Sequence, residues 1–527
     1  MSYYISEPVK NLINSFSYQE EVPKDVSKIK VDHFVSKMAF FYEKLRNVVD
    51  YKDKHLLRRS AIERILRRRI TVDKDKSKIA ENIIKELIWA KYLKNNKLPE
   101  TKILQVQSII NKYLNLINST QYAKRRDKKK FIEWTMGVVS CEVEDALISL
   151  RSVGAIVETM FQVMDARLKI KDVKLDDATK KILCYIAIHR TLIKSDPATI
   201  RYFLLKLAYP EWFGGTAQEI NEISRNIKGI QEEIEGYMNN RLSFRFKRLM
   251  KNYTPLFLIL RTVVADNLGE INELLDNPAS LQAEIEKKTE QKYKEVKSNL
   301  RRAAFRSIIY LFMTKMLLAV IIEVPVDLYW LKTVEWLPIG INVAFPPLLM
   351  LMVAIFTRVP GKKNTTRIIK GINSIVYSDR KETIIFNARS SYVRSSFLSI
   401  FFKFSYFITF IISFGAVGYV LYILHFNLAS AFVFFMFLTL VSFFGFRVRD
   451  GAKEYLIPAK KDSVIRLLFD LYTLPILRAG RWISQEFSKI NIFVFVFDFL
   501  IEAPFKMLIE LGEQWLGFVR EKREEII

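Results

Sequence analysis

The chain contains few of the residues from which metal centres and disulfide frameworks are built. Its 527 residues include two cysteines, Cys141 and Cys184, and four histidines. Neither residue type shows the spacing of a metal site or of a disulfide-stapled domain. We therefore expect no metal and no cofactor, and we interpret both cysteines as small buried hydrophobic residues. Glycine (17) and proline (15) are also scarce, which argues against long disordered segments.

Sequence signatures of catalysis are missing as well. There is no G-x-x-x-x-G-K-[ST] phosphate loop, no G-x-G-x-x-G, no H-E-x-x-H and no G-x-S-x-G. His189 follows an apolar helical face, which is typical of a core histidine. The acidic residues Glu142, Glu144 and Asp145 are typical of a solvated helix face. The sequence therefore favours a protein that is not an enzyme, with an enzyme that acts on lipid at the cytoplasmic interface as a third alternative.

Positive charge is abundant, with 82 Lys and Arg against 56 Asp and Glu and a formal net charge of +26. Two basic clusters stand out: residues 58–69, where we expect a hydrated or lipid-facing helix surface, and residues 124–130, which resemble a linker. Neither belongs to a recognisable nucleic-acid-binding module, so nucleic acid is not an expected partner.

Much of the other positive charge flanks apolar segments. This placement is typical of a membrane protein that faces anionic lipids at the cytoplasmic surface.

Long apolar segments are confined to the second half of the chain. Four of them are long enough to cross a bilayer, at about 305–326, 337–357, 397–424 and 427–446. The connections at one side of these spans are rich in Lys and Arg, whereas the links at the other side are short. The positive-inside rule then predicts two hairpins in the plasma or inner membrane of a cell, with both termini in the cytoplasm. The first residues do not form a secretory signal, which agrees with this arrangement.

Apolar residues before the first span recur with helical spacing, and no segment there alternates like a strand. We therefore predict an all-α fold in which a cytoplasmic helical bundle precedes the membrane domain. The expected parts are a flexible arm (1–30), the helical bundle (31–213), a coiled-coil connector (214–303), the transmembrane domain (304–446) and cytoplasmic interfacial amphipathic helices (447–527).

Two helical stripes suggest contacts with other molecules. Isoleucines within residues 216–239 alternate at spacings of three and four, which predicts a short coiled-coil seam for a second copy or a protein partner. Near the C-terminus, Asp498, Glu502, Lys506 and Glu510 recur every four residues on a mostly apolar helix. This pattern favours a helix at the membrane surface over a fifth and sixth span.

Ionisable residues inside the first span are the strongest indication of a functional site. Lys315 lies near its middle, where a lysine costs roughly 2.5–3.5 kcal/mol, and Glu323 and Asp327 follow toward its outer end. Lys315 and Glu323 are about 12 Å apart along a straight helix, which argues against a direct pair. Carbonyls freed by Pro346 and Pro347 in the second span would then receive the lysine. As an alternative, the carboxylates are ordinary interface anchors and the lysine extends toward the interface.

Three segments resemble a group of membrane proteins from small-genome bacteria of the candidate phyla radiation. They are IIEVPVDLYW (321–330), INVAFPPLLMLMVAIF (341–356) and RAGRWISQEFSKINIFVFVFDFLIEAPFKMLIE (478–510). The likeness extends over most of the chain. It implies a bacterial cell membrane as the setting, but no activity and no site residues, because that group has no assigned activity.

Two functions follow from these features. The long cytoplasmic part, the isoleucine stripe and the missing catalytic motifs favour an interaction or scaffolding module that four spans anchor in the membrane. The alternative is an ion or small-solute channel or transporter that uses Lys315, Glu323 and the second span, which Pro346 and Pro347 interrupt.

Overall fold

The structure is a computed structural model that describes most of the chain. The described residues are 4–18, 26–32, 36, 37, 39, 40, 43, 44, 56–73, 75–122, 124–171, 173, 175–332, 335–377, 383–387, 396–458, 464–489 and 503–524. They fold almost entirely as helices, so the all-α prediction is confirmed. The described strands are β1 (Leu168–Ile170) and β2 (Ile384–Phe386), which pair in parallel with Leu168 opposite Ile384.

The chain forms two compact units that alternate along the sequence. Unit 1 comprises residues 1–6, 167–174 and 252–490, and unit 2 comprises residues 7–166, 175–251 and 491–527. Among the described residues, four single helices are long and apolar enough to cross a membrane, and all four belong to unit 1. These candidate spans are Pro278–Tyr329, Trp336–Phe356, Ile400–Ile423 and Leu428–Ala452.

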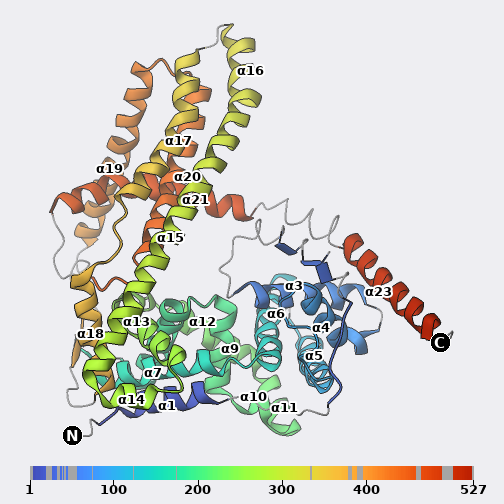
Figure 1. Ribbon diagram of the computed structural model, residues 1–527. Coiled ribbons are helices and arrows are strands. Elements are labelled where there is room, and N and C mark those ends of the chain that lie inside the picture. Colours follow the sequence, from blue (N-terminus) through green and yellow to red (C-terminus); the bar gives the residue numbers. More distant parts are fainter. Residues whose placement is uncertain are drawn as a thin grey trace. The chain divides into compact units, whose positions relative to one another are not determined.

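The first candidate span continues a helix that begins far outside it. Helix α15 (Pro278–Leu318) opens with proline at its first position, and the Asn277 side chain caps the first backbone N–H groups. The helical path then runs through two π-helical segments, η4 (Ala319–Glu323) and η5 (Asp327–Leu331), with the short α16 (Val324–Val326) between them. Figure 1 shows this path as one long rod.

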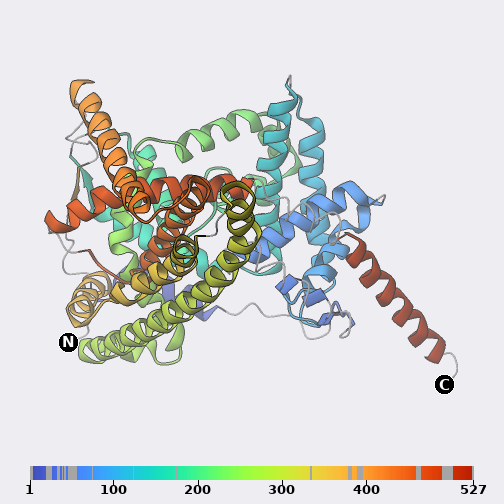
Figure 2. The ribbon, with the colours of Figure 1, turned by 90° about the horizontal axis from the view of Figure 1, so that it is seen from above.

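The remaining helices of unit 1 build a bundle around the second and fourth candidate spans. Helix α17 packs against α15 and α20, α20 packs against α21, and α21 packs against α19, as both ribbon views show (Figures 1 and 2). Only 17% to 44% of each candidate span is buried inside the protein. Apolar helix faces that are exposed over so wide an area are typical of surfaces that contact lipid hydrocarbon. The elements named here are α17 (Trp336–Phe356), α19 (Ser396–Ile423), α20 (Leu428–Ala452) and α21 (Val464–Lys489).

The connection between the second and third spans contains helix α18 (Lys362–Val376), which packs on α15 and buries Ile368, Ile372 and Val376. The Asn364 side chain at its start donates to the Tyr293 hydroxyl of α15 and accepts from the Ile457 backbone N–H. These contacts join three separated stretches of unit 1. Helix α14 (Ile271–Asp276) and the end of α13 (Ser243–Asp266) complete this part.

Unit 2 is a helical bundle whose central element is α6, which packs on α3, α5 and α9. Helices α6 and α7 together also reach an apolar length sufficient for a span, but they meet at 110°, and we assign α6 to this core. The elements are α1 (Glu7–Ser17), α3 (Leu57–Val72), η2 (Lys76–Lys78), α4 (Ile79–Trp89), α5 (Thr101–Ser119), α6 (Arg125–Leu147), α7 (Arg151–Arg167), α8 (Asp177–Ile188), the π-helical η3 (His189–Ile193), α9 (Pro197–Ala208), α10 (Glu211–Gly214), α11 (Ala217–Arg225), α12 (Ile227–Met238), the start of α13, and α23 (Ala503–Glu524).

The isoleucine stripe is divided between two helices rather than carried by one. A capping box of Thr216 and Glu219 starts α11, as the sequence indicates, but the helix ends at Arg225 and α12 begins at Ile227. Helix α12 buries its part of the stripe against α8 and α9, whereas α11 has no buried residue. The predicted coiled coil between molecules therefore stays a prediction, and the isoleucines of α11 are half-buried, whereas those of α12 are buried.

The structure describes α1 near the N-terminus, but it does not describe the charged stripe near the C-terminus. Within the predicted flexible arm, α1 forms a helix that buries Val9 and Leu12 completely. Asp498 and Glu502 of the charged C-terminal stripe lie outside the described residues, and so do the side chains of Lys506 and Glu510.

Gly137 allows the close crossing of α6 and α9. A Cβ atom at this glycine would lie 2.8 Å from the Cβ of Ala198. We expect Gly137→Ala to destabilise the protein by about 1–3 kcal/mol, because one of two buried helices must move. Thermal unfolding of the full chain in detergent would measure this as a lower Tm. Gly236→Ala in α12 is the matched control: its Cβ would meet open space, and alanine favours a helix by up to about 1 kcal/mol. Equal Tm values for the two variants would contradict the crossing.

Candidate functional site

A buried ion pair lies inside the first candidate span. The Lys315 ammonium donates to Glu323 Oε1 at 2.6 Å, and both side chains are 0% exposed. The ammonium also lies 4.8 Å from the centre of the Phe437 ring of α20. Because neither charge reaches water, each depends on the other and on the polar groups around them.

The expectation that Lys315 and Glu323 do not pair is wrong, and the reason is local helix geometry. Eight residues of regular α-helix would leave the two side chains about 80° apart around the axis. The π-helical segment Ala319–Glu323 is wider and turns less per residue, which brings Glu323 back to the lysine side. The Cα–Cβ bond of the glutamate also tilts toward the helix N-terminus, which shortens the remaining gap.

The second and fourth spans contribute uncharged polar groups to the pair. Asn342 of α17 donates through Nδ2 to Glu323 Oε2 at 3.0 Å and to the Ser430 carbonyl of α20 at 3.1 Å. Two acceptors on one side of the amide fix which atom is the nitrogen. Asn342 therefore joins all three helices at one point.

Asp327 extends the cluster toward the short links between the spans. Its Oδ1 accepts from Asn427 Nδ2 at 2.7 Å, and Asn427 Oδ1 in turn caps α20 by accepting from the Ser430 N–H at 2.8 Å. A continuous series of hydrogen-bonded groups thus runs from Lys315 to Asp327 through three helices. Asp327 itself is only 1% exposed.

Pro346 and Pro347 line the same face of α17 as Asn342, and all three are buried. From the sequence, the backbone carbonyls that these prolines free are expected to accept hydrogen bonds from the Lys315 ammonium. The contacts of Lys315 in the described structure are instead the Glu323 carboxylate and the Phe437 ring. Full burial also excludes the alternative in which the lysine extends to the interface.

The sequence prediction found the charged members of this cluster but missed Asn342, Asn427 and Ser430. A signal for two of them was present. Asn427 and Ser430 have the spacing of a helix cap at the start of the fourth span. Asn342 is an amide in the second span, which has no ionisable residue between Trp336 and Phe356.

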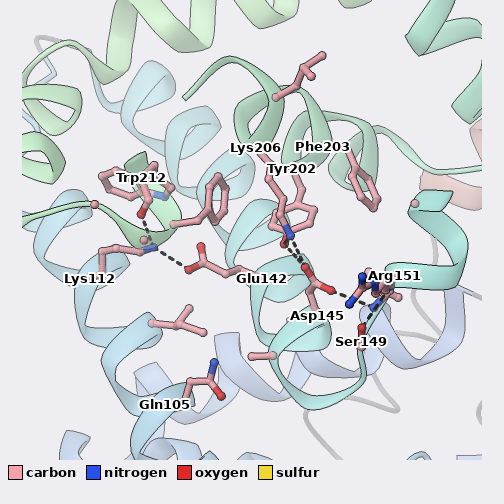
Figure 3. Close-up of a pocket in the computed structure, with 18 of the residues that line it drawn as sticks. Gln105, Lys112, Glu142, Asp145, Ser149, Arg151, Tyr202, Phe203, Lys206 and Trp212 are labelled. Carbon is pink, nitrogen blue, oxygen red and sulfur yellow. Dashed lines mark hydrogen bonds and ion pairs between the residues drawn. The ribbon is translucent and has the colours of Figure 1, made fainter. Parts of the chain in front are cut away.

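Unit 2 contains a second candidate site, a pocket of about 910 Å³ lined by α5, α6, α7, α9 and α10 (Figure 3). Lys112 Nζ lies 2.7 Å from Glu142 Oε1 and donates to the Trp212 carbonyl. Asp145 accepts from the Tyr202 hydroxyl at 2.6 Å and from Lys206 at 2.7 Å. The acids of α6 and the lysines of α5 and α9 thus neutralise one another within the pocket wall.

The protonation equilibria in this pocket follow from burial and pairing. Burial raises the pKa of Glu142, although Lys112 and Tyr113 donate to it, and burial lowers the pKa of Lys112. Burial alone would raise the pKa of Asp145, but the hydrogen bonds from Lys206 and Tyr202 outweigh it and lower that pKa. The expectation of a solvated acidic face is therefore wrong for these carboxylates.

The basic clusters also differ from expectation. Arg59 is buried and pairs with Asp196, and Arg69 pairs with Glu86 at 2.6 Å. These arginines are part of the interior of unit 2 and not a hydrated or lipid-facing surface. Residues 125–130 form the first turns of α6 and not a linker.

The cysteines and His189 take the structural roles expected from the sequence. Cys141 and Cys184 are buried, and burial raises the pKa of both thiols. His189 is fully buried between Tyr185 and Phe203, and burial lowers its pKa to about 3. Its Nδ1 lies 3.2 Å from the Ser195 hydroxyl. A neutral core histidine fits this environment.

The Lys315–Glu323 pair allows a test by double substitution. Lys315→Met or Glu323→Gln alone leaves one buried charge unpaired, so each should destabilise the protein by about 3–5 kcal/mol. The combined variant removes both charges and keeps an acceptor for Asn342, so its Tm should lie close to that of the wild type. Thermal unfolding in detergent measures all three, with Lys403→Met, an exposed lysine of α19, as control. Additive losses in the combined variant would show that the pair does not exist.

Comparison of the chain with protein-family models, with curated proteins and with solved structures finds no match. The chemistry of the cluster in the spans and of the pocket in unit 2 is therefore the basis for assigning a role. The cluster is the stronger candidate, because buried charges in hydrocarbon mark functional sites more often than paired charges in a helical bundle.

Proposed function

We propose that the protein is a multi-pass membrane transporter or channel for a small ion, with the polar cluster of the spans as its site. The observation that carries the proposal is the series of hydrogen-bonded polar groups from Lys315 to Asp327. It joins the first candidate span to α17 and α20, and it is buried except at the half-buried Asn427. A purely structural anchor needs none of these groups in its spans. Residues of this type line ion and proton pathways in membrane proteins.

The helices that hold the cluster contain the features that allow spans to bend. Two π-helical segments flank α16 in the first span, and such segments often occur at functional sites. Pro346 and Pro347 interrupt the hydrogen-bond ladder of the second span. Bending at these points would open the cluster toward one end of the bundle without unfolding the fourth span.

The sidedness and the setting of the protein form part of the same proposal. Basic residues flank one end of the spans, and the two short links lie at the other end. The positive-inside rule then places both termini in the cytoplasm. We assign the protein to a bacterial inner membrane, in line with the family resemblance, and its basic side to anionic lipids.

Reconstitution into proteoliposomes tests transport. Currents on a solid-supported membrane under imposed H⁺, Na⁺, K⁺ or Cl⁻ gradients should appear with the wild-type protein. They should be lost in the folded Lys315→Met/Glu323→Gln variant, because that variant removes the charges of the pathway. The Lys403→Met variant should keep the current. No wild-type current under any gradient, or an unchanged current in the double variant, would contradict the proposal.

A second candidate function, scaffolding, is supported by the part of the isoleucine stripe that is only half-buried. Ile220 and Ile223 of α11 are half-buried, in contrast to the buried isoleucines of α12. Helix α11 therefore offers a short apolar edge for the same helix of a second copy. Its length of nine residues limits this contact to about one heptad.

Self-association through α11 can be tested on the full chain in detergent. Ile220→Glu/Ile223→Glu should convert a dimer to a monomer in light-scattering measurements of mass without lowering Tm. The control Gln218→Glu/Asn221→Glu adds the same charge at exposed positions of the same helix and should leave the dimer intact. A monomeric wild type would rule out this role.

A further inference from the structure

We propose that the polar cluster binds one monovalent cation, a proton or a sodium ion, at Asp327. The inference rests on the proposed transport function and names the class of ion that the spans would move. It starts from the charges and the unsatisfied oxygen atoms of the cluster, and it requires no group from outside unit 1.

The charges of the cluster do not balance. Lys315 provides one positive charge, whereas Glu323 and Asp327 provide two negative charges, and all three side chains are at most 1% exposed. The lysine is paired with Glu323, so the excess negative charge lies on Asp327. An unpaired buried charge is too costly to persist in a membrane interior. A further positive charge would restore neutrality.

The nearby helix terminus compensates for only part of this excess. Asp327 is held by Asn427, the residue that caps α20, so it lies at the positive end of the α20 dipole. A helix N-terminus is equivalent to about half a positive charge. Roughly half a negative charge therefore stays uncompensated at the aspartate.

The cluster also contains oxygen atoms that lack partners. Among the described residues, Asp327 Oδ2, Asn342 Oδ1 and Ser430 Oγ are buried and have no hydrogen-bond partner. Two of these atoms can only accept, because the Asn342 nitrogen already donates to Glu323 and to the Ser430 carbonyl. The Ser430 hydroxyl can supply one donor but not two, so this site still lacks a further donor or a cation. A proton on Asp327 Oδ2 would provide the first, and a sodium ion bound by oxygen ligands would provide the second.

The other elements around Asp327 offer no alternative positive charge inside the bundle. Helix α17 has no ionisable side chain, and α20 has none before Arg447. Among the described residues, the other ionisable groups in or beside the short links are Lys332, Glu335, His425 and the tyrosines Tyr329 and Tyr422, and all of them are exposed. The buried charges of the site are therefore those of Asp327, Glu323 and Lys315.

The position of Asp327 suits the entrance of a pathway. It begins η5, four residues before the helical path ends at Leu331, and Asn427 belongs to the other short link. An ion entering from the side of these links would meet Asp327 first and the Glu323–Lys315 pair beyond it. The hydrogen-bonded series through Asn427, Ser430 and Asn342 connects the two.

The test measures binding apart from flux, on the purified full chain in detergent. One arm records Tm in NaCl and in choline chloride of equal ionic strength. A bound sodium ion should raise Tm in proportion to the logarithm of its concentration, and Asp327→Asn should remove that dependence. The other arm records infrared spectra between pH 5 and pH 9. A bound proton should give a carboxylic acid C=O band that titrates and that Asp327→Asn removes.

Two further variants separate the cases. Ser430→Ala should weaken a sodium effect but leave a proton band in place, and it serves if Asp327→Asn fails to fold. Glu335→Gln, an exposed acid at the same end, should change neither signal. A sodium effect or a carboxyl band that depends on Asp327 supports the inference even if the liposomes carry no current, in which case only transport fails. Absence of both signals, or signals unchanged in Asp327→Asn and Ser430→Ala, overturns it even if a current is found.

Discussion

A lysine inside an apolar helix bundle needs its counter-charge within the same few ångströms, and this requirement accounts for most of the local structure of unit 1. Lys315 reaches Glu323 only because a π-helical segment lies between them. The second carboxylate oxygen of Glu323 then holds Asn342, and through it α17 is joined to the start of α20. Without the ion pair, none of these polar atoms would have a reason to be buried where water is absent.

Unit 2 meets the same requirement in a different way. Its central helix α6 carries two acids, Glu142 and Glu144, that are buried and pair with Lys112 of α5 and Arg58 of α3. Each pair requires one register between two helices, because a shift of one residue would leave both charges buried and unpaired. These two acids are thus balanced within the fold, and their pairs specify packing. The charges of the spans are not balanced.

Features set by local sequence could be predicted, and features set by tertiary contact could not. Hydropathy and length were sufficient for the four candidate spans, and Asn277-Pro278 marked the start of α15. The pairing of Lys315 with Glu323 depends on a π-helical segment that leaves no mark in the residue pattern. The burial of Glu142 depends on Lys112, thirty positions earlier in the chain, which no periodicity of α6 reveals. Asn342 was overlooked because an amide contributes no charge to a hydropathy profile.

The difference between a structural ion pair and a binding site lies in what each leaves unsatisfied. A pair that only fastens helices together ends with equal charges and with most of its buried oxygen and nitrogen atoms in hydrogen bonds. In the cluster of the spans, the charges of Lys315 and Glu323 are equal and opposite. The charge of Asp327 has no counter-charge, and one of its carboxylate oxygens lies buried without a donor among the described residues. Desolvation of such a group is tolerated only if something completes it for part of the time. The proposed cation, arriving and leaving, would satisfy this condition, and so the unsatisfied atom and the proposed transport have the same physical explanation.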